Sequence, residues 1–596
     1  MTGAIHTHEL ASGLLLTDLY QLNMAQAYLD AGLTDTAVFD FYVRDLPNLR
    51  NFVLTAGQEQ VLDLLENARF TDAELSWLRD SGRFTSTFLD YMAELRFTGD
   101  VHALPEGTVV FAGEPILRVE APLPVAQLLE TRLINLMHTS MVVASKAARM
   151  KLAAPSHKLV DFGLRRAHGA EAGLLAARAA HIPGFDGTAT VPAEPLWGIP
   201  ITGTMAHAFV EAHPEEEQAF LDFARSRPND TVFLLDTYDT EAAAHKVVRV
   251  ARTLADEGIK VHGVRIDSGD LAEQAARVRA ILDDGGLDGV PILASGGLDE
   301  WTLRELADDE AAIDGFGLGT ALTTASDAPA FNCAYKLQMY GERHTRKVSE
   351  GKATLPGRKQ IWRAYDGGGH MQADVLGLAD EPAPGGSPLM TRVMANGERV
   401  APAESLTTVR ERAARDDDTV RGWRGRGLNR SHPDEHLLLP VVVRYGVFGS
   451  PVEVVSIHHG VRPFYVLHDH LPCGLLGGRR RRLRDRDFVQ PTVHVVFKLL
   501  PRQLRDEVKL GAILLLEVVE RLAATQVFDL YLGPVLIDEY VGYVSLAVLV
   551  YLLGFLPPGR VFFTHLPSVH AAECAHPNVG HVSQLCDDTI RANRVG

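Results

Sequence analysis

Five short turns in the middle of the chain hold the residue types best suited to binding and chemistry. Each turn follows a short apolar segment and combines carboxylates, hydroxyls, arginines or glycines; the turns are residues 161–165, 236–239, 267–270, 295–297 and 317–320. Such turns are expected at the carboxyl ends of parallel strands, where barrels and open α/β sheets collect their functional groups. The pattern predicts one site built from several loops.

The third turn carries the densest set of polar groups. Arg265, Asp267, Ser268 and Asp270 fall within one short stretch. Backbone N–H groups of such a turn can hold a phosphate. The two carboxylates can instead hold ribose hydroxyls or Mg²⁺, which prefers oxygen ligands. The alternative is an ordinary strand-to-helix turn in which Asp270 caps the next helix.

The last two turns are rich in small residues. Glycine lets the backbone approach a phosphate closely, and barrels often hold phosphates at their late strands. Either turn alone would be explained equally well as a tight turn, but two in succession favour phosphate binding. The residues concerned are Ser295, Gly296, Gly297, Gly317, Gly319 and Thr320.

The first turn offers an aromatic ring beside two guanidinium groups, those of Phe162, Arg165 and Arg166. A planar aromatic acid would need a ring to stack on and a bidentate, charge-assisted partner for its carboxylate. The alternative is that both arginines form surface salt bridges. If the arginines are not taken up in this way, the turn predicts a site for a flat carboxylated ligand.

A histidine lies beside another glycine-containing segment. His207 ends the sequence GTMAH at 203–207 and can act as a nucleophile or a base. A lone histidine can equally be structural. The chain has no HExxH, GxxxxGK[ST] or GxSxG sequence, which argues against a zinc protease, a P-loop NTPase and an α/β-hydrolase.

The elements that must position these residues alternate between strand and helix. Apolar runs at 158–161, 232–235, 261–266, 291–294 and 315–317 are separated by helical segments, most clearly 240–257 and 270–283. This alternation predicts an α/β fold with parallel strands and helical crossovers, in a barrel-like arrangement. Upstream, a helix is expected at 19–31, a strand at 37–43 and a small β unit at 109–119, whereas 341–399 reads as polar and loop-rich.

Bulk composition narrows the class of protein. At 596 residues the chain is expected to form two or more domains, and 46% hydrophobic with 22% charged residues is typical of a globular protein. A net charge of −18 argues against nucleic-acid binding. The start shows no secretory signal, and four cysteines without a CxxC pair suit a reducing cytoplasm. The apolar stretch 540–556 is short for a membrane span and is expected to be buried core.

The composition changes after about residue 415. No methionine follows, and no alanine occurs between Ala414 and Ala512. The arginine run 479–482 lacks interleaved aromatic residues and is interpreted as a solvated segment, and the histidines at 458–459 and 468–470 form no closed ligand set with cysteine. Residues 416–596 are therefore an unassigned tail, and we hypothesise that they are read-through in another frame.

Six motifs, taken together and in order, resemble the nicotinate phosphoribosyltransferase family, of the type II phosphoribosyltransferase fold group. They are TDLYQ at 17–21, FGLR at 162–165, GTMAH at 203–207, LDTYDT at 235–240, RIDSGD at 265–270 and SEGK…LPGRK at 349–359. The resemblance covers about residues 14–415. It implies an N-terminal α/β domain (14–132), an irregular α/β barrel (133–337) and a return of the chain to the first domain (338–415).

The resemblance also implies an activity and a set of ligands. Members make nicotinate mononucleotide and pyrophosphate from nicotinate and phosphoribosyl pyrophosphate, with Mg²⁺ and with ATP hydrolysis coupled to synthesis, usually as homodimers. His207 matches the histidine that ATP phosphorylates. Tyr20 and Phe162 match the aromatic pair around the pyridine ring, with Tyr20 reaching across from the partner subunit.

The remaining site residues are carried over in the same way. Arg165 and Arg265 match residues near the base and the phosphoribosyl group, and Asp236 and Asp239 match acidic residues lining the site. The ribose and phosphate cradle is matched by Asp267, Ser268, Gly296, Gly297, Gly317, Gly319 and Thr320.

One substitution bears on the choice of substrate. Related nicotinamide-using enzymes carry an aspartate where this chain has Ala189. An aspartate would accept a hydrogen bond from an amide and repel a carboxylate, so alanine favours the acid. Two other functions stay open: a phosphoribosyltransferase of the same fold acting on nicotinamide or quinolinate, and a non-catalytic nucleotide-binding or regulatory protein disabled by its tail.

Overall fold

The computed structural model describes residues 13–47, 50–347, 354–383, 385–424, 444–445, 452–459 and 462–469. The chain divides into two units, 1–475 and 476–596, and every described residue belongs to the first. The arginine run 479–482, the apolar stretch 540–556, most of the tail and part of the motif at 349–359 lie outside the described residues. Within the described part, no helix is long and apolar enough to cross a membrane.

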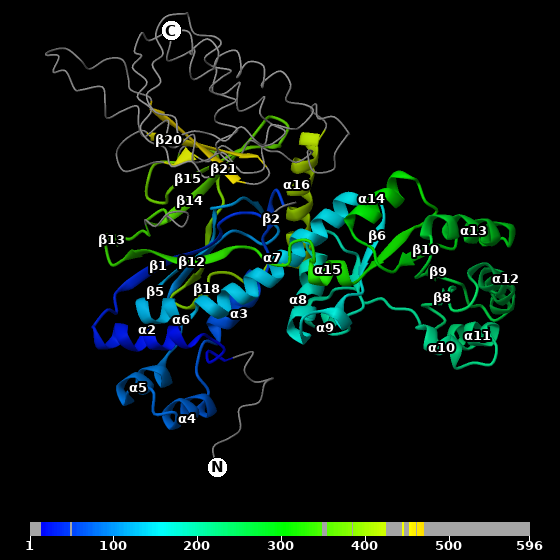
Figure 1. Ribbon diagram of the computed structural model, residues 1–596, viewed down its shortest axis with the longest axis horizontal. Helices are drawn as coiled ribbons and strands as arrows, with labels where there is room; N and C mark the ends of the chain where they lie inside the picture. Colours follow the sequence, from blue (N-terminus) through cyan, green and yellow to red (C-terminus); the bar gives the residue numbers. More distant parts are fainter. Residues whose placement is uncertain are drawn as a thin grey trace, which may run out of the picture. The chain divides into compact units, whose positions relative to one another are not determined.

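A six-stranded parallel sheet forms the centre of one part of the chain, residues 158–318 (Figure 1). Its order is β7-β6-β11-β10-β9-β8, and every pairing within it is parallel. The strands are β6 (Lys158–Asp161), β7 (Gly187–Thr188), β8 (Val232–Leu234), β9 (Gly263–Ile266), β10 (Ile292–Ser295) and β11 (Gly315–Leu318). The sheet is a half-barrel with β7 and β8 as its edges, which confirms the predicted α/β class with parallel strands.

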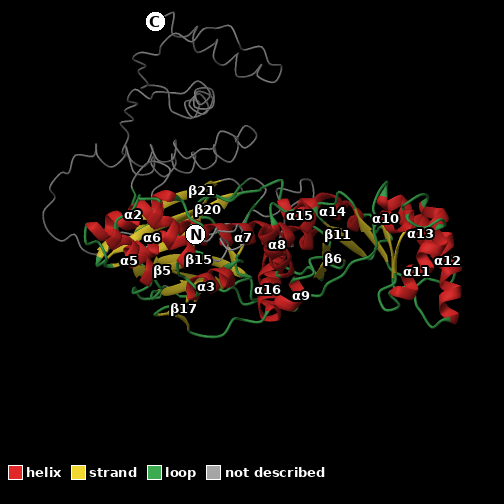
Figure 2. Cartoon of the chain, turned by 90° about the horizontal axis from the view of Figure 1, so that it is seen from below, coloured by secondary structure: helices red, strands yellow, loops and turns green. Residues whose placement is uncertain are grey.

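Helices connect successive strands of this sheet. Figure 2 shows helices α11 to α13 beside its strands. The connecting elements are η1 (Leu164–Arg166), α8 (Ala170–His181), α9 (Ala193–Trp197), α10 (His207–Glu211), α11 (Glu216–Ser226), α12 (Thr240–Asp256), α13 (Leu271–Asp284) and α14 (Glu300–Asp308), and α15 (Thr320–Thr324) follows the last strand, β11. The two helices expected at 240–257 and 270–283 are confirmed to within a residue or two.

Helix α12 shows why these segments fold as they do. Ala243, Val247, Val250 and Leu254 recur at helical spacing and are buried, while the opposite face is exposed. One apolar face of this kind must be covered by another element. In this chain α12 packs against its neighbours α11 and α13, and α13 contacts β9 and β10.

A second, seven-stranded sheet joins the start of the chain to residues that follow the parallel sheet. Its order is β13-β12-β1-β5-β3-β17-β18, with antiparallel pairings. The strands are β1 (Thr36–Val43), β3 (Asp100–Ala103), β5 (Pro115–Pro122), β12 (Cys333–Tyr340), β13 (Arg343–His344), β17 (Thr391–Ala395) and β18 (Glu398–Arg399). The expected N-terminal α/β domain, completed by later chain, is confirmed.

Helices accompany this sheet, and one of them is long. They are α2 (Leu19–Asp30), α3 (Gln58–Glu66), α4 (Asp72–Asp80), α5 (Ser86–Glu94), α6 (Leu123–Leu128) and α7 (Glu130–Ala153), with the short strands β2 (Val53–Leu54) and β4 (Val109–Val110). Helix α7 contacts β2 and β12 as well as α8, α14 and α15. It therefore connects the seven-stranded sheet to the helices of the half-barrel.

The expectation that 341–399 is loop-rich is wrong. Strands β14 (Lys359–Tyr365), β15 (Met371–Leu378) and β16 (Ser387–Pro388) pair there, and β19 (Arg444–Tyr445) joins β15. These strands contain charged residues that are buried in ion pairs, so their sequences lack the apolar pattern expected of buried strands. Lys359 contacts Asp40 at 2.7 Å, and Arg363 contacts Asp374 at 2.6 Å.

Helix α16 (Leu406–Arg424) runs across residue 415, where the composition changes. Asp416 is buried, and its Oδ2 accepts a hydrogen bond from the Val109 amide at 2.9 Å. The same oxygen lies 3.5 Å from the Arg363 guanidinium. Two further strands, β20 (Val452–His459) and β21 (Arg462–Asp469), pair with each other.

Candidate active site

The predicted turns lie along one edge of the parallel sheet. The strand register pairs Asp161 with Leu318, Gly317 with Ser295 and Ala294 with Ile266. These pairs fall at or within a residue of the carboxyl ends of β6, β11, β10 and β9. The turns after these strands are therefore neighbours in space, as the alternation of strands and helices predicts.

A hydrogen-bonded cluster joins the turns after β8, β9 and β10. The Ser268 hydroxyl donates to Asp236 Oδ2 at 2.6 Å, and the Asp267 amide donates to the same oxygen at 3.2 Å. The Ser295 hydroxyl donates to Asp267 Oδ1. Asp236 Oδ1 is buried and has no hydrogen-bond partner. This cluster presents two carboxylates and two hydroxyls, groups suited to binding a ribose or an oxygen-seeking cation.

Arg265 connects this cluster to the segment that carries His207. Its NH1 lies 3.6 Å from Asp267 Oδ1 and 3.4 Å from the Ser295 hydroxyl, while its NH2 donates to the Met205 carbonyl at 2.8 Å. Burial lowers the pKa of Arg265, partly offset by Asp267 and Asp236. An arginine remains charged despite such a shift, so the cluster keeps one cation beside its carboxylates.

His207 lies at the start of α10, and a hydroxyl orients its ring. Nδ1 of His207 is 3.2 Å from Oγ1 of Thr237, which follows Asp236 in the turn after β8. A partner on Nδ1 selects the tautomer and leaves Nε2 for a second ligand. Thr237 lies in the LDTYDT motif, but the carboxylates of Asp236 and Asp239 carry the chemical signal of that motif, and a threonine between them is inconspicuous.

Phe162 occupies space that a glycine leaves open. A Cβ at Gly317 would lie 2.4 Å from Cε2 of the Phe162 ring. The turn is anchored by Asp161, which is buried and accepts hydrogen bonds from the Gly163 amide at 2.8 Å and the Thr188 hydroxyl at 2.7 Å. Burial raises the pKa of Asp161. The sequence predicts that Gly317 lies at a phosphate, whereas in the structure its missing side chain leaves space for the Phe162 ring.

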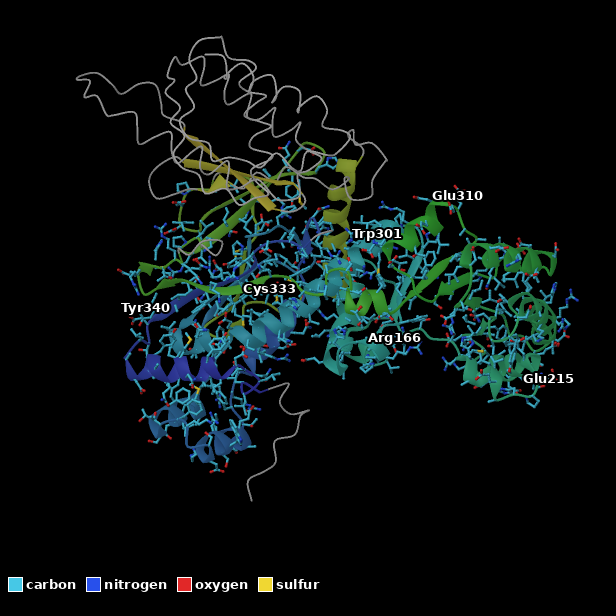
Figure 3. All side chains as sticks on the ribbon, in the orientation of Figure 1. Arg166, Glu215, Trp301, Glu310, Cys333 and Tyr340 are labelled. Carbon is cyan, nitrogen blue, oxygen red and sulfur yellow. The ribbon has the colours of Figure 1, made fainter. Side chains whose placement is uncertain are left out.

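Ala189 and the two arginines of the first turn lie near this ring. The Ala189 amide donates to the Asp161 carbonyl at 2.8 Å, and the Ala189 side chain is exposed. Arg165 and Arg166 are exposed in η1. Arg166, labelled in Figure 3, donates to the Thr320 hydroxyl at 3.0 Å rather than to a carboxylate. Ala189 therefore pairs with the turn that carries Phe162, and the two exposed arginines follow the ring in the same turn.

The remaining glycines of these turns have no side chain, which lets the backbone of one turn lie close to its neighbours. Gly296 has φ of +99°, and a Cβ there would lie 2.0 Å from the Asp267 carbonyl oxygen. Gly297 also has a positive φ, of +66°. Gly319 precedes α15, and a Cβ there would lie 3.4 Å from the Phe162 carbonyl oxygen, an ordinary contact.

Two predicted site aspartates cap helices. Asp239 Oδ1 accepts from the Ala242 amide at 2.8 Å at the start of α12, and Asp270 Oδ1 accepts from the Glu273 amide at 3.0 Å at the start of α13. The interpretation of Asp270 as an ordinary helix cap is therefore confirmed. Asp239 is exposed and has the same local role.

Tyr20 does not join Phe162 within the chain. Its hydroxyl donates to Glu130 Oε2 at 3.2 Å, where α2 meets the start of α7. Burial and the Glu130 charge raise the pKa of Tyr20 to about 12, yet 47% of the residue is exposed. No contact between the Tyr20 and Phe162 rings occurs among the described residues.

Two carboxylates of the cluster at the sheet edge suit a magnesium ion that is bound together with a ligand. In the described part of the chain no three His, Cys, Asp or Glu side chains gather in a group that would hold a metal. Mg²⁺ is usually held by one or two carboxylates with substrate phosphates and water. Asp236 and Asp267, with the unpartnered Asp236 Oδ1, fit that pattern.

Comparison with known proteins identifies the family. The model for the nicotinate phosphoribosyltransferase (NAPRTase) N-terminal domain matches residues 15–138, and that for the NAPRTase family matches 157–355. "Nicotinate phosphoribosyltransferase pncB2" of Mycobacterium tuberculosis is 45% identical over 388 residues, which are 65% of this chain and 83% of that protein. The chain belongs to the nicotinate phosphoribosyltransferase family. The Bacillus subtilis nicotinate phosphoribosyltransferase is 41% identical over 376 residues, 62% of this chain and 76% of the relative.

Solved structures agree with this family membership. The human nicotinic acid phosphoribosyltransferase superposes with a TM-score of 0.62 at 30% identity, over 68% of this chain and 94% of that chain. The nicotinate-nucleotide pyrophosphorylase of Pyrococcus furiosus gives 0.56 at 25% identity, over 70% and 98%. The NAPRTase family match at 157–355 contains all five turns of the sheet edge, and Tyr20 falls in the NAPRTase N-terminal match.

Proposed function

We propose that this member of the nicotinate phosphoribosyltransferase family makes nicotinate mononucleotide and pyrophosphate from nicotinate and phosphoribosyl pyrophosphate, in NAD salvage. The observation that carries the proposal is the convergence of Phe162, the Arg265–Asp267 pair and His207 at one edge of the sheet. The names of the relatives support the choice of nicotinate as substrate.

The pyridine ring of nicotinate stacks on Phe162 in this proposal, and its carboxylate binds Arg165. Ala189 borders the ring without adding a charge, which suits an acid rather than an amide. Tyr20 closes the other face from the partner subunit of a homodimer. Its exposure, and the absence of a ring contact with Phe162 among the described residues, support a contribution in trans.

The phosphoribosyl group lies over the hydrogen-bonded cluster. Asp236, Asp267 and Ser268 bind ribose hydroxyls, and Arg265 balances the charge of the phosphates. The backbone amides at Gly296, Gly297, Gly319 and Thr320 hold phosphate oxygens, with Ser295 fixing Asp267 below them. Asp239 caps α12 at the border of this site, and Gly317 acts through the placement of Phe162.

The reaction is a displacement at the anomeric carbon. The nicotinate ring nitrogen forms a bond to C1 of the ribose while the bond from C1 to the pyrophosphate oxygen breaks, and the electron pair leaves with pyrophosphate. Positive charge builds on the ribose, and the neighbouring Asp267 carboxylate stabilises it. The ring nitrogen is already nucleophilic, so a strong base is not required. Mg²⁺, held by Asp236 and Asp267 with the diphosphate, would neutralise charge on the leaving group.

His207 accepts the γ-phosphoryl group of ATP in this proposal. The bond from the γ-phosphorus to the bridging oxygen breaks, ADP leaves, and a phosphohistidine forms at the ring nitrogen not facing Thr237. Hydrolysis of the phosphohistidine then drives nucleotide synthesis towards product. Arg265 couples the two steps physically, because it contacts both Asp267 and the Met205 carbonyl near His207.

The setting of the enzyme is also proposed. A cytoplasmic homodimer suits the sparse cysteines and the contribution of Tyr20 from a partner. The proposed domain limits are 14–132, 133–337 and 338–415, and residues 416–596 form the tail. Limited proteolysis should leave an active fragment that retains α16, which ends at Arg424. A tail that folds cooperatively by itself would refute read-through.

A pyrophosphate-release assay tests the function. Purified protein with phosphoribosyl pyrophosphate is given nicotinate, nicotinamide or quinolinate, each with and without ATP. We expect release with nicotinate, stimulated by ATP. Release with nicotinamide or quinolinate instead would assign another base, and no release with any pyridine would favour the non-catalytic alternative.

A further inference from the structure

Ion pairs join five charged side chains, two of which follow glycine-containing turns in the sequence, and we call the group the charge cluster: Arg50, Lys146, Arg149, Glu300 and Asp327. The side chains of Arg50, Lys146 and Glu300 are 4% exposed or less, and those of Arg149 and Asp327 are 13% and 18% exposed. Buried charges of this kind are stable only when they are paired and held in a fixed geometry.

Lys146 is the member that contacts both carboxylates. Its Nζ donates to Glu300 Oε2 and, at 2.8 Å, to Asp327 Oδ1. Each carboxylate also has a second cation, since Arg149 Nε lies 2.9 Å from Glu300 Oε1 and Arg50 NH1 lies 2.6 Å from Asp327 Oδ2. Two separate ion pairs are thus joined into one network through a single ammonium group.

The two carboxylates follow the two turns in the sequence, at different distances. Glu300 is the first residue of α14, three positions after Gly297. Asp327 follows α15, the short helix that begins after Gly319. Lys146 and Arg149 belong to α7, which contacts both α14 and α15. Arg149 also lies over the ring of Trp301 on α14, labelled in Figure 3, at 5.4 Å.

We infer that Lys146 is a positioning residue for phosphoribosyl pyrophosphate: by holding Glu300 and Asp327 together it fixes the spacing of the turns at Gly296–Gly297 and Gly319. This inference rests on the proposed function, in which those turns hold phosphate. Backbone amides cannot adjust to a phosphate as a long side chain can, so their spacing must be set in advance. An error of about 1 Å in such a site can cost about 10²-fold in rate.

The variant Lys146→Met tests this inference. Methionine keeps much of the volume and removes the ammonium group, while Arg149 and Arg50 still pair the two carboxylates, which favours folding. We expect the KM for phosphoribosyl pyrophosphate to rise about tenfold or more, with the KM for nicotinate within about twofold of wild type, because Phe162 has its own anchor at Asp161.

Arg149→Met is the matched control. It also removes one buried cation from Glu300, but leaves Lys146 joining Glu300 to Asp327. We expect its KM for phosphoribosyl pyrophosphate to rise less than about threefold. A structural role alone would reduce the amount of folded enzyme in both variants without changing either KM.

The results separate the inference from the function on which it rests. If wild-type protein releases pyrophosphate with nicotinate but Lys146→Met keeps the wild-type KM for phosphoribosyl pyrophosphate, or raises both KM values equally, the inference is wrong. If wild-type protein releases none, the proposed function fails first. Should Lys146→Met not fold, Asp327→Asn replaces it: a selective rise in the same KM supports the inference, and no rise overturns it.

Discussion

Replacing Gly317 by alanine should weaken nicotinate binding while leaving phosphoribosyl pyrophosphate binding almost intact. The added Cβ would lie 2.4 Å from Cε2 and 2.5 Å from Cδ2 of Phe162, and 3.2 Å from the Ser295 Cβ. Ordinary contact begins near 3.4 Å, so the ring must move by about 1 Å, the difference between the two distances. Gly317 is buried within β11, which is paired with β10 on one side and β6 on the other.

The displaced ring loses its stack with the pyridine. Such a stack contributes about 0.5–1.5 kcal/mol, which corresponds to a rise of about 2- to 13-fold in the KM for nicotinate. Overpacking of this kind also costs stability, on the order of 1–3 kcal/mol. Steady-state pyrophosphate release, with each substrate varied in turn, measures the first effect, and thermal unfolding measures the second.

Gly319→Ala is the control, because its Cβ would lie 3.4 Å from the Phe162 carbonyl oxygen and would not displace the ring. We expect its KM for nicotinate to stay within about twofold of wild type. The reasoning would be refuted by an unchanged nicotinate KM in Gly317→Ala. A rise only in the KM for phosphoribosyl pyrophosphate would instead indicate that Gly317 contacts the phosphate, as predicted from the sequence.

Substitutions at four other positions test separate parts of the site and fold. Ala189→Asp should lose nicotinate turnover through charge repulsion and gain nicotinamide turnover; unchanged nicotinate kinetics would show that the ring lies elsewhere. His207→Ala should abolish ATP stimulation while some ATP-independent synthesis remains, so undiminished stimulation contradicts its role as phosphoryl acceptor. Thr237→Val should reduce ATP stimulation about fivefold, because it removes the hydrogen bond to the His207 imidazole. Thr237→Ser keeps a hydroxyl and should retain the stimulation, and equal losses in both variants would show that Thr237 acts through packing. Burial and the nearby Arg410 lower the pKa of His181 to about 4. As pH falls from about 6.5 to 4, the unfolded chain therefore gains a proton at this residue while the folded chain does not, and the stability of the folded state falls. His181→Gln should make the melting temperature depend less on pH across that window, and an unaltered slope would assign the effect to other groups.

The parallel sheet was predictable because its strands are short apolar runs followed by polar turns. Runs at 158–161 and 315–317 match β6 and β11 closely. The two-residue strand β7 gives too short a signal to be recognised. Strands β14 and β15 were missed for a different reason, since Arg363 and Asp374 read as surface residues but are paired with each other inside the protein.

The groups that touch the proposed ligands were easier to predict than the groups that hold them. Arg265, Asp267 and His207 lie in motifs whose residue types suggest chemistry, and the structure brings them together. Thr237 and Lys146 gave no such signal, because a hydroxyl in a turn and a lysine in a helix are common. The roles proposed for them depend on partners 30 and 154 positions away in the sequence.

The open side of the half-barrel bears on how His207, the proposed phosphoryl acceptor, is held in place. Both β7 and β8 are edge strands, and the chain between them carries His207. After the bridge between Thr188 and Ile201, residues 203–231 contribute no strand to the sheet. Its helix α11 packs against α12 with Ala219, Phe220 and Ala224 buried, so the segment that carries His207 is held beside the strands by helix packing rather than by strand pairing.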